Sequence, residues 1–263
     1  MMIGFPSTGK TTFIAALWKY LKEVDDKNFQ LDHLPSEREY LEQLVASWLQ
    51  CETLSRTFSG TIEEISFTVK TQEGQSFNIL IPDIKGETYR QIFLTRTIEK
   101  NLSLKLKDAS GLLVFISSQL DDVSSHNRCC VSTSGDPKVN LSKIPPFSPE
   151  YTPTRIQLVD VLQAILDINN NNLKVAIVIS AWDLIEDRIA PNEWVRINIP
   201  FVYNFIKNNF VNFRCFGISA QGGDYESNKE ELLSMDIPIN RIKVFVDDSN
   251  SNDITLPLQY LIK

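Results

Sequence analysis

Residues 4–11 contain the residue types that bind phosphate groups, at the spacing that this chemistry requires. They read GFPSTGKT, a complete G-x-x-x-x-G-K-T motif. Gly4 and Gly9 let the backbone turn tightly, so that successive N–H groups face the phosphates of a nucleotide. Lys10 adds a positive charge for the β- and γ-phosphates, and the Thr11 hydroxyl is placed to ligate Mg²⁺. The segment predicts a phosphate-binding loop; the alternative is a glycine turn beside an exposed lysine.

The residues within and after this loop support the interpretation. A strongly helical stretch follows at 12–21, so the loop ends at a helix N-terminus, where the helix dipole favours anions. Ser7, Thr8 and Thr12 are the further residues that we expect at the phosphates. Only three residues precede Gly4, whereas a buried strand usually has about five residues. We therefore expect the first strand to be truncated in this sequence.

A second candidate site is the sequence DIKGE at 83–87, directly after an apolar run at 77–81. An aspartate at the end of a strand can hold Mg²⁺ through water, and a glycine N–H just beyond it can reach a γ-phosphate. Asp83 is therefore predicted as a magnesium ligand and Gly86 as a contact to the nucleotide. Together they would sense whether the γ-phosphate is present. An ordinary Asp-Gly turn has the same pattern.

Two short segments after later apolar runs indicate that the base is guanine. Asp183 occupies the aspartate position of an N-K-x-D motif, and its carboxylate would accept from N1–H and the 2-amino group, a donor pair that adenine lacks. Ser180 and Ala181 replace the Asn and Lys of that motif, which removes an aliphatic stack on the base. Ser219 and Ala220 follow the next run, and the Ala220 N–H would donate to guanine O6. Capping of a turn is the alternative role for Asp183.

Hydrolysis would need a threonine in the first switch segment, expected at 52–61, that closes on Mg²⁺ and the γ-phosphate. Thr53, Thr57 and Thr61 all lie in this stretch and could bind Mg²⁺. Thr57 is preferred because its neighbour Arg56 could reach the phosphates as an arginine finger. A solvated loop arginine is the alternative.

A second catalytic candidate follows the D-x-x-G motif. Glu87 could orient the attacking water if a nearby cation, Lys85 or Arg90, compensates its charge. Lys10 would contribute by neutralising phosphate charge. Slow intrinsic turnover, raised by a partner or by self-association, is the expectation, and a surface helix position is the alternative for Glu87.

The composition is that of an ordinary soluble protein, with 43% hydrophobic and 22% charged residues. A net charge of −7 argues against nucleic-acid binding, which needs a basic surface. The four cysteines show no C-x-x-C spacing, so reduced thiols and a cytoplasmic location are expected rather than a metal cluster. No apolar run reaches about 18 residues, so we expect no membrane span.

The elements that position these motifs alternate between strands and helices. Continuous apolar runs at 112–116, 175–179 and 214–218 indicate strands covered on both faces. The alternating runs 61–71 and 75–82 predict an antiparallel hairpin. Helices are expected at 11–24, 36–50, 89–106, 154–168 and 192–209, and in a final segment 256–263 that is cut short. This order predicts an α/β fold, the three-layer sandwich of a P-loop NTPase, with a mainly parallel sheet, one antiparallel edge hairpin and helices on both faces. We expect one domain over 1–263, with an insertion loop at 119–153.

With these motifs in place, the sequence resembles P-loop GTPases of the translation-factor-related, Ras-like class. More narrowly, it resembles the double-GTPase families of bacterial conflict and defence systems. The segments that carry this likeness are GKTTFIAALW at 9–18, DIKGE at 83–87, AWD at 181–183 and DITLPLQYLI at 253–262. The resemblance implies a Mg²⁺-dependent switch that binds GTP and GDP and acts on partner proteins. The alternatives are a kinase or ATPase with the same phosphate loop, and a pseudo-GTPase that binds nucleotide without hydrolysing it.

Overall fold

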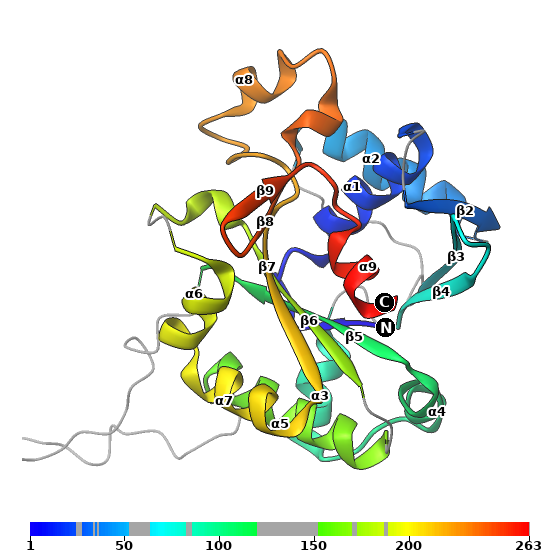
Figure 1. The fold of residues 1–263 in the computed structure, drawn as a ribbon, viewed down its shortest axis with the longest axis vertical. Helices are drawn as coiled ribbons and strands as arrows, with labels where there is room; N and C mark the ends of the chain where they lie inside the picture. Colours follow the sequence, from blue (N-terminus) through cyan, green and yellow to red (C-terminus); the bar gives the residue numbers. More distant parts are fainter. Residues whose placement is uncertain are drawn as a thin grey trace, which may run out of the picture.

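The computed structural model describes residues 1–24, 28–33, 35, 37–52, 64–82, 86–119, 152–169, 173–186 and 189–262 (Figure 1). In this part of the chain the larger sheet has the strand order β1-β5-β6-β7-β8-β9. Its strands are β1 (Met2–Gly4), β5 (Gly111–Ser117), β6 (Lys174–Ser180), β7 (Asn212–Ser219), β8 (Lys243–Val246) and β9 (Ser249–Ser251). The first four are parallel, and β8 and β9 extend the sheet in antiparallel directions.

Helices cover both faces of this sheet, which confirms the predicted α/β class and its three layers (Figure 1). One face packs against α1 (Lys10–Glu23), α2 (Arg38–Leu49) and α9 (Leu256–Ile262). The other packs against α3 (Glu87–Thr95), α4 (Lys100–Asp108), α5 (Thr154–Ile168), α6 (Pro191–Asn198) and α7 (Pro200–Asn209). None of the described helices is long and apolar enough to cross a membrane.

The continuous apolar runs are explained by this double cover. In β5, Leu113 and Phe115 pack into the core on the α1 side, whereas Leu112, Val114 and Ile116 pack on the α5 side. Successive side chains of a strand point to opposite faces, so a strand covered on both sides is apolar at every position. The sheet is therefore held between two separate hydrophobic cores.

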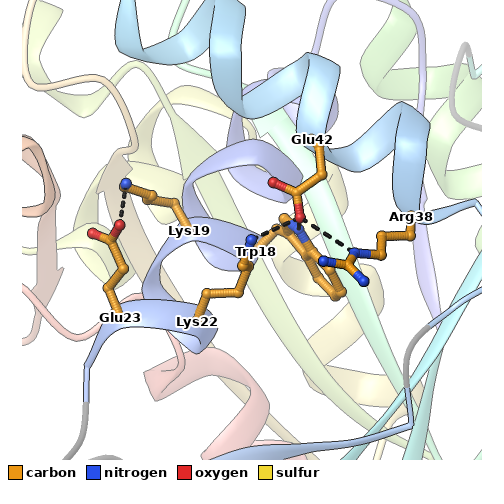
Figure 2. A network of polar contacts seen from close by, with 6 residues as sticks. All are labelled: Trp18, Lys19, Lys22, Glu23, Arg38 and Glu42. Carbon is orange, nitrogen blue, oxygen red and sulfur yellow. Dashed lines mark hydrogen bonds and ion pairs between the residues drawn. The ribbon is translucent and has the colours of Figure 1, made fainter.

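Helices α1 and α2 are joined by packing and by charge. Glu42 of α2 accepts hydrogen bonds from Trp18 Nε1 (3.3 Å) and Lys22 Nζ (2.7 Å) of α1, and Arg38 Nε lies 3.8 Å from the same oxygen (Figure 2). The Trp18 ring lies edge-on to Phe67, with 5.8 Å between the ring centroids. Phe67 belongs to a second, three-stranded sheet, so α1 packs against both sheets.

The predicted hairpin forms, as β3 (Ile65–Thr71) and β4 (Ser76–Ile81) in antiparallel register. It does not extend the larger sheet, however. β3 pairs on its other edge with β2 (Phe29–His33), and these strands make a separate three-stranded sheet, with β4 contacting β1. Strand β2 is not visible in the sequence, because only Phe29 is buried in it and its apolar pattern is too weak to indicate a strand.

Two predicted helices are each broken into two. The helix expected at 89–106 ends at Thr95, where Arg96 takes a left-handed conformation (φ 58°) as the C-cap residue; its side chain forms an ion pair with Asp160 of α5. The helix expected at 192–209 breaks at Ile199, since a residue before proline is disfavoured in the α conformation and Pro200 begins α7.

The segment after β7 contains elements that the sequence analysis did not predict. These are β8, β9, α8 (Lys229–Leu233) and the 3-10 helix η5 (Pro238–Arg241). β9, α8 and η5 are short and mostly polar, and β8 has only four residues, so neither helical nor strand periodicity is clear in this segment. Residues 120–151 of the predicted insertion lie outside the described part of the chain, as does Ser36, the first residue of the helix expected at 36–50.

Candidate nucleotide-binding site

Three of the predicted motifs meet at one edge of the larger sheet. Gly4 ends β1, Ser180 ends β6 and Ser219 ends β7. The strand register aligns these ends, because Ser117 of β5 pairs with Ser180, which in turn pairs with Ile218. The carboxyl edge of an open parallel sheet is where such folds bind ligands.

The phosphate-loop segment turns from β1 into α1 as its two glycines predict. Ser7 (φ 61°) and Gly9 (φ 76°) have left-handed backbones, and the Thr8 hydroxyl donates to Phe5 O at 2.8 Å across the turn. A Cβ on Gly9 would lie 2.7 Å from Ser180 Cβ. Glycine at this position therefore meets two requirements, for conformation and for space.

Helix α1 begins at Lys10, so its free N–H groups and the positive end of its dipole are at the loop. Its first turn carries no acidic residue. The Lys10 ammonium is buried and donates to Gly4 O (2.7 Å) and Phe5 O (2.8 Å). These bonds fix the charge beside the loop, which is where an anion on the helix N-terminus would need it.

Gly86 lies directly against this loop. A Cβ at Gly86 would be 2.5 Å from Gly4 O and 2.7 Å from Lys10 Nζ, and the residue has a left-handed backbone (φ 81°). Only a glycine allows so close an approach of two backbones. The glycine of the second motif and the lysine of the first are thus neighbours, although 76 residues separate them in the sequence.

The segment that follows β6 carries the predicted base-reading aspartate. Ala181 has a left-handed backbone (φ 52°), and its carbonyl accepts a hydrogen bond from the Ser118 hydroxyl at 2.7 Å. Trp182 is buried, and its ring lies where a side chain on Gly217 would be, 2.2 Å from that Cβ position. Asp183 is exposed in a one-turn 3-10 helix. The buried tryptophan anchors the turn and leaves the aspartate accessible.

The Ser219–Ala220 loop is fixed from behind. Ser219 is buried, and its hydroxyl accepts from the Gly222 N–H at 3.0 Å. The Ala220 carbonyl accepts from Trp48 Nε1 at 3.0 Å. Because its carbonyl is held by the end of α2, the orientation of the loop is set by a helix distant in the sequence.

Several predicted site residues are not brought into this arrangement by described contacts. Glu87 is exposed at the start of α3. Arg56, Thr57 and the other first-switch threonines lie outside the described residues, as do Asp83 and Lys85.

Other residues support the site although the sequence analysis did not select them: Ser118, Trp182, Gln221, Tyr225 and Arg241. Ser118 carried a detectable signal, since it directly follows a strand end in the sheet. The roles of the rest depend on contacts between distant segments.

Of the three predicted magnesium ligands, Thr11 alone is among the described residues. It is half-buried in the first turn of α1, next to Lys10. Its hydroxyl is a hard oxygen donor, and Mg²⁺ is usually held by one or two side chains together with substrate phosphates. The position of Thr11 fits such an ion. Within the described ranges, no group of three or more His, Cys, Asp or Glu side chains could hold a metal.

The phosphate loop at the carboxyl edge of a mainly parallel sheet, with Gly86 against Lys10, defines the P-loop nucleotide-binding class. The chain matches the model of the family Double-GTPase 1 over residues 1–261, and it belongs to that family. No curated protein matches it. The family assignment confirms the resemblance found in the sequence and identifies a GTP-binding domain.

Proposed function

We propose that this chain is a guanine-nucleotide switch that hydrolyses GTP slowly and regulates partner proteins or copies of itself. The observation that supports this most strongly is the approach of Gly86 to the Lys10 ammonium. A γ-phosphate beside Lys10 would lie next to the Gly86 N–H as well. Its loss on hydrolysis would then change the contacts of the segment that leads into α3.

The roles of the residues follow from this geometry and from the chemistry of their side chains. The backbone of residues 4–12 would hold the phosphates, with Lys10 neutralising their charge. When bound, Mg²⁺ would neutralise charge on the phosphate oxygens, held by Thr11 with Thr57 and Asp83.

The base would be read by Asp183 together with Ser219 and Ala220. Glu87 and Arg56 are proposed to assist hydrolysis. With Glu87 exposed, its action on a water would depend on closure of the site, which gives a physical reason for slow turnover.

A pseudo-GTPase is the second candidate, and one observation favours it. Ser180 replaces the usual Asn and Ala181 the usual Lys, and the Ser180 side chain packs against Gly9 instead. These changes weaken the base contacts, and Glu87, exposed where Ras-like enzymes usually carry Gln, could leave a bound nucleotide without a group that orients the water.

The experiment is a titration of GTP, GDP and ATP into the purified chain with Mg²⁺, followed by measurement of phosphate release. We expect GTP and GDP to bind at least about tenfold more tightly than ATP, because a wrong base leaves the Asp183 oxygens unpaired. Lys10→Ala should abolish tight binding, and Asp183→Asn should remove the guanine preference or shift it to xanthine.

Three results would separate the alternatives. Equal binding of ATP and GTP, with Asp183→Asn silent, would favour an ATPase. Tight GTP binding with no phosphate release would favour the pseudo-GTPase. For the switch itself, hydrogen exchange of residues 86–93 should be slower with a non-hydrolysable GTP analogue than with GDP, and equal exchange would contradict it.

A further inference from the structure

Gln221 directly follows the Ser219–Ala220 pair. Ras-like GTPases carry a Ser-Ala-Lys loop at this point, so Gln221 occupies the position of its lysine. Its side chain is 7% exposed and points into the protein. The amide nitrogen donates to Trp48 O at 3.3 Å and to Cys51 Sγ at 3.1 Å, and the amide oxygen accepts from the Tyr225 hydroxyl at 3.2 Å. This residue therefore uses both ends of its amide to connect two segments, the end of α2 and the stretch around Tyr225.

The first of these segments is the end of α2. The Arg241 guanidinium, 2% exposed, donates to Trp48 O at 3.4 Å and Leu49 O at 3.3 Å, and lies 5.2 Å from the centre of the Trp48 ring. A cation at the C-terminal carbonyls of a helix is favoured by the helix dipole. The partner that Gln221 contacts is thus itself a fixed part of the structure.

The second segment is the stretch around Tyr225, four residues further along the same loop, whose hydroxyl donates to Gln221. Burial raises the pKa of Tyr225 to about 12, so the phenol stays neutral at physiological pH and can donate to Gln221. Gln221 thus links Tyr225 to the end of α2, directly behind the Ser219–Ala220 pair.

We propose that Gln221 is a positioning residue for guanine recognition. By tying the 219–222 loop to the end of α2, it fixes the Ala220 N–H where guanine O6 would accept from it. Because the Ala220 N–H is already in place, binding does not have to order it. Only a base with an oxygen at position 6 can accept from this N–H, so only such bases gain affinity. The inference rests on the proposed guanine site.

The test is Gln221→Met, which preserves the length of the side chain and removes its hydrogen bonds. Affinities for GTP, inosine triphosphate and ATP are measured by calorimetry. Inosine has O6 and N1–H but lacks the 2-amino group. We expect the affinities for GTP and inosine triphosphate to fall by the same factor, about tenfold for one good hydrogen bond, while ATP is unaffected. Asp183→Asn should instead change the ratio of GTP to inosine triphosphate affinity.

Gln259→Met is the matched control. Gln259 is another buried amide, 8% exposed, and donates to Asp253 Oδ2 at 2.8 Å and Thr255 Oγ1 at 2.9 Å, away from the 219–222 loop. It should lower the melting temperature without altering the preference for GTP over ATP. If Gln221→Met had the same effect as this control, the positioning role would be wrong.

A second variant keeps the test valid if Gln221→Met does not fold. Tyr225→Phe removes only the hydroxyl that contacts Gln221, and should weaken GTP and inosine triphosphate by a smaller common factor. An unchanged preference in Tyr225→Phe as well would overturn the proposal while leaving the guanine site intact. A parent chain that binds ATP as tightly as GTP would overturn the proposed function, and the role of Gln221 with it.

Discussion

Replacing Gly217 with alanine tests the packing that supports the base-reading turn. Gly217 is in the middle of the sheet, paired with Ile179 of β6 and Phe245 of β8. A methyl group there would lie 2.2 Å from Trp182 Cδ2, well inside normal contact distance. The indole cannot move away freely, because it also packs against Trp194 and Phe245, with 6.1 and 6.4 Å between ring centroids. The strand or the tryptophan must shift.

The size of the effect follows from two opposing terms. Overpacking of a well-filled core costs about 1–3 kcal/mol. Alanine in a strand recovers about 0.5–1 kcal/mol relative to glycine. Because the contact would be as short as 2.2 Å, the upper part of the overpacking range applies, about 2–3 kcal/mol, and the net loss is about 1–2.5 kcal/mol. At about 2–4 °C per kcal/mol for a domain near this size, the melting temperature should fall by about 2–10 °C. Because Asp183 is next to Trp182 in the chain, we expect the affinity of Gly217→Ala for GTP to fall together with its stability.

The assay is thermal and urea unfolding of the nucleotide-free chain, followed by GTP titration. Gly111→Ala is the control, because its Cβ would meet one leucine side chain at contacts that are tight but longer, 3.2 Å from Leu261 Cδ2 and 3.3 Å from Leu261 Cβ. We expect it to lose clearly less stability than Gly217→Ala, because a leucine side chain can give by a few tenths of an ångström. If Gly217→Ala were as stable as Gly111→Ala and bound GTP equally well, the tryptophan would not anchor the turn.

Three further predictions concern other parts of the molecule. Gly86→Ala should weaken GTP binding measured by calorimetry at least about tenfold, because its left-handed backbone and its contact with Lys10 leave no room for a methyl group; parental affinity would contradict this. Burial raises the pKa of the Cys215 thiol from 9.0 to about 12, so its contribution to stability is complete below pH 9 and is lost as pH rises toward 12. The free energy of unfolding, measured with urea across this pH range, should decline less steeply for Cys215→Ala than for the parent. Equal slopes in the two proteins would refute the contribution of Cys215. The hydrogen bond from Lys22 holds the pKa of Glu42 below its ordinary value. The contribution of Glu42 to folding stability is therefore present above pH 4.5 and is lost on acidification. Because the Glu42 side chain is 38% exposed, Glu42→Gln should cost less than about 1 kcal/mol near neutral pH, and less still in high salt. A larger cost that is insensitive to salt would contradict a screened ion pair.

Much of the fold could be predicted because its signals are local. The strands at 112–116, 175–179 and 214–218 appear as apolar runs, and α5 begins and ends where its pattern predicts, at Thr154 and Ile168. The breaks at Arg96 and Ile199 were missed for different reasons. The first is a left-handed residue at an arginine, with no glycine or proline beside it to signal a break, whereas the second is visible in the sequence as the proline that follows.

The candidate site divides in the same way. Residue types and spacing at 4–11 were sufficient to predict a phosphate loop, since its turn depends on glycines that are close in the chain. The order of the motifs indicates that Gly86 and Lys10 lie at the same edge of the sheet. That a Cβ on Gly86 would be 2.7 Å from Lys10 Nζ is decided by the tertiary structure.

By itself, the sequence determined the class of protein: a phosphate loop before a helix, motifs after apolar runs, and a sheet covered on both faces. These features depend on backbone preferences and on the periodicity of burial, which act over a few residues. Tertiary structure alone decided that the hairpin joins β2 in a separate sheet and that Gln221 turns inward to Trp48 and Tyr225. Strand pairing and buried hydrogen bonds depend on which distant segments the fold brings into contact, and composition or spacing does not contain that information.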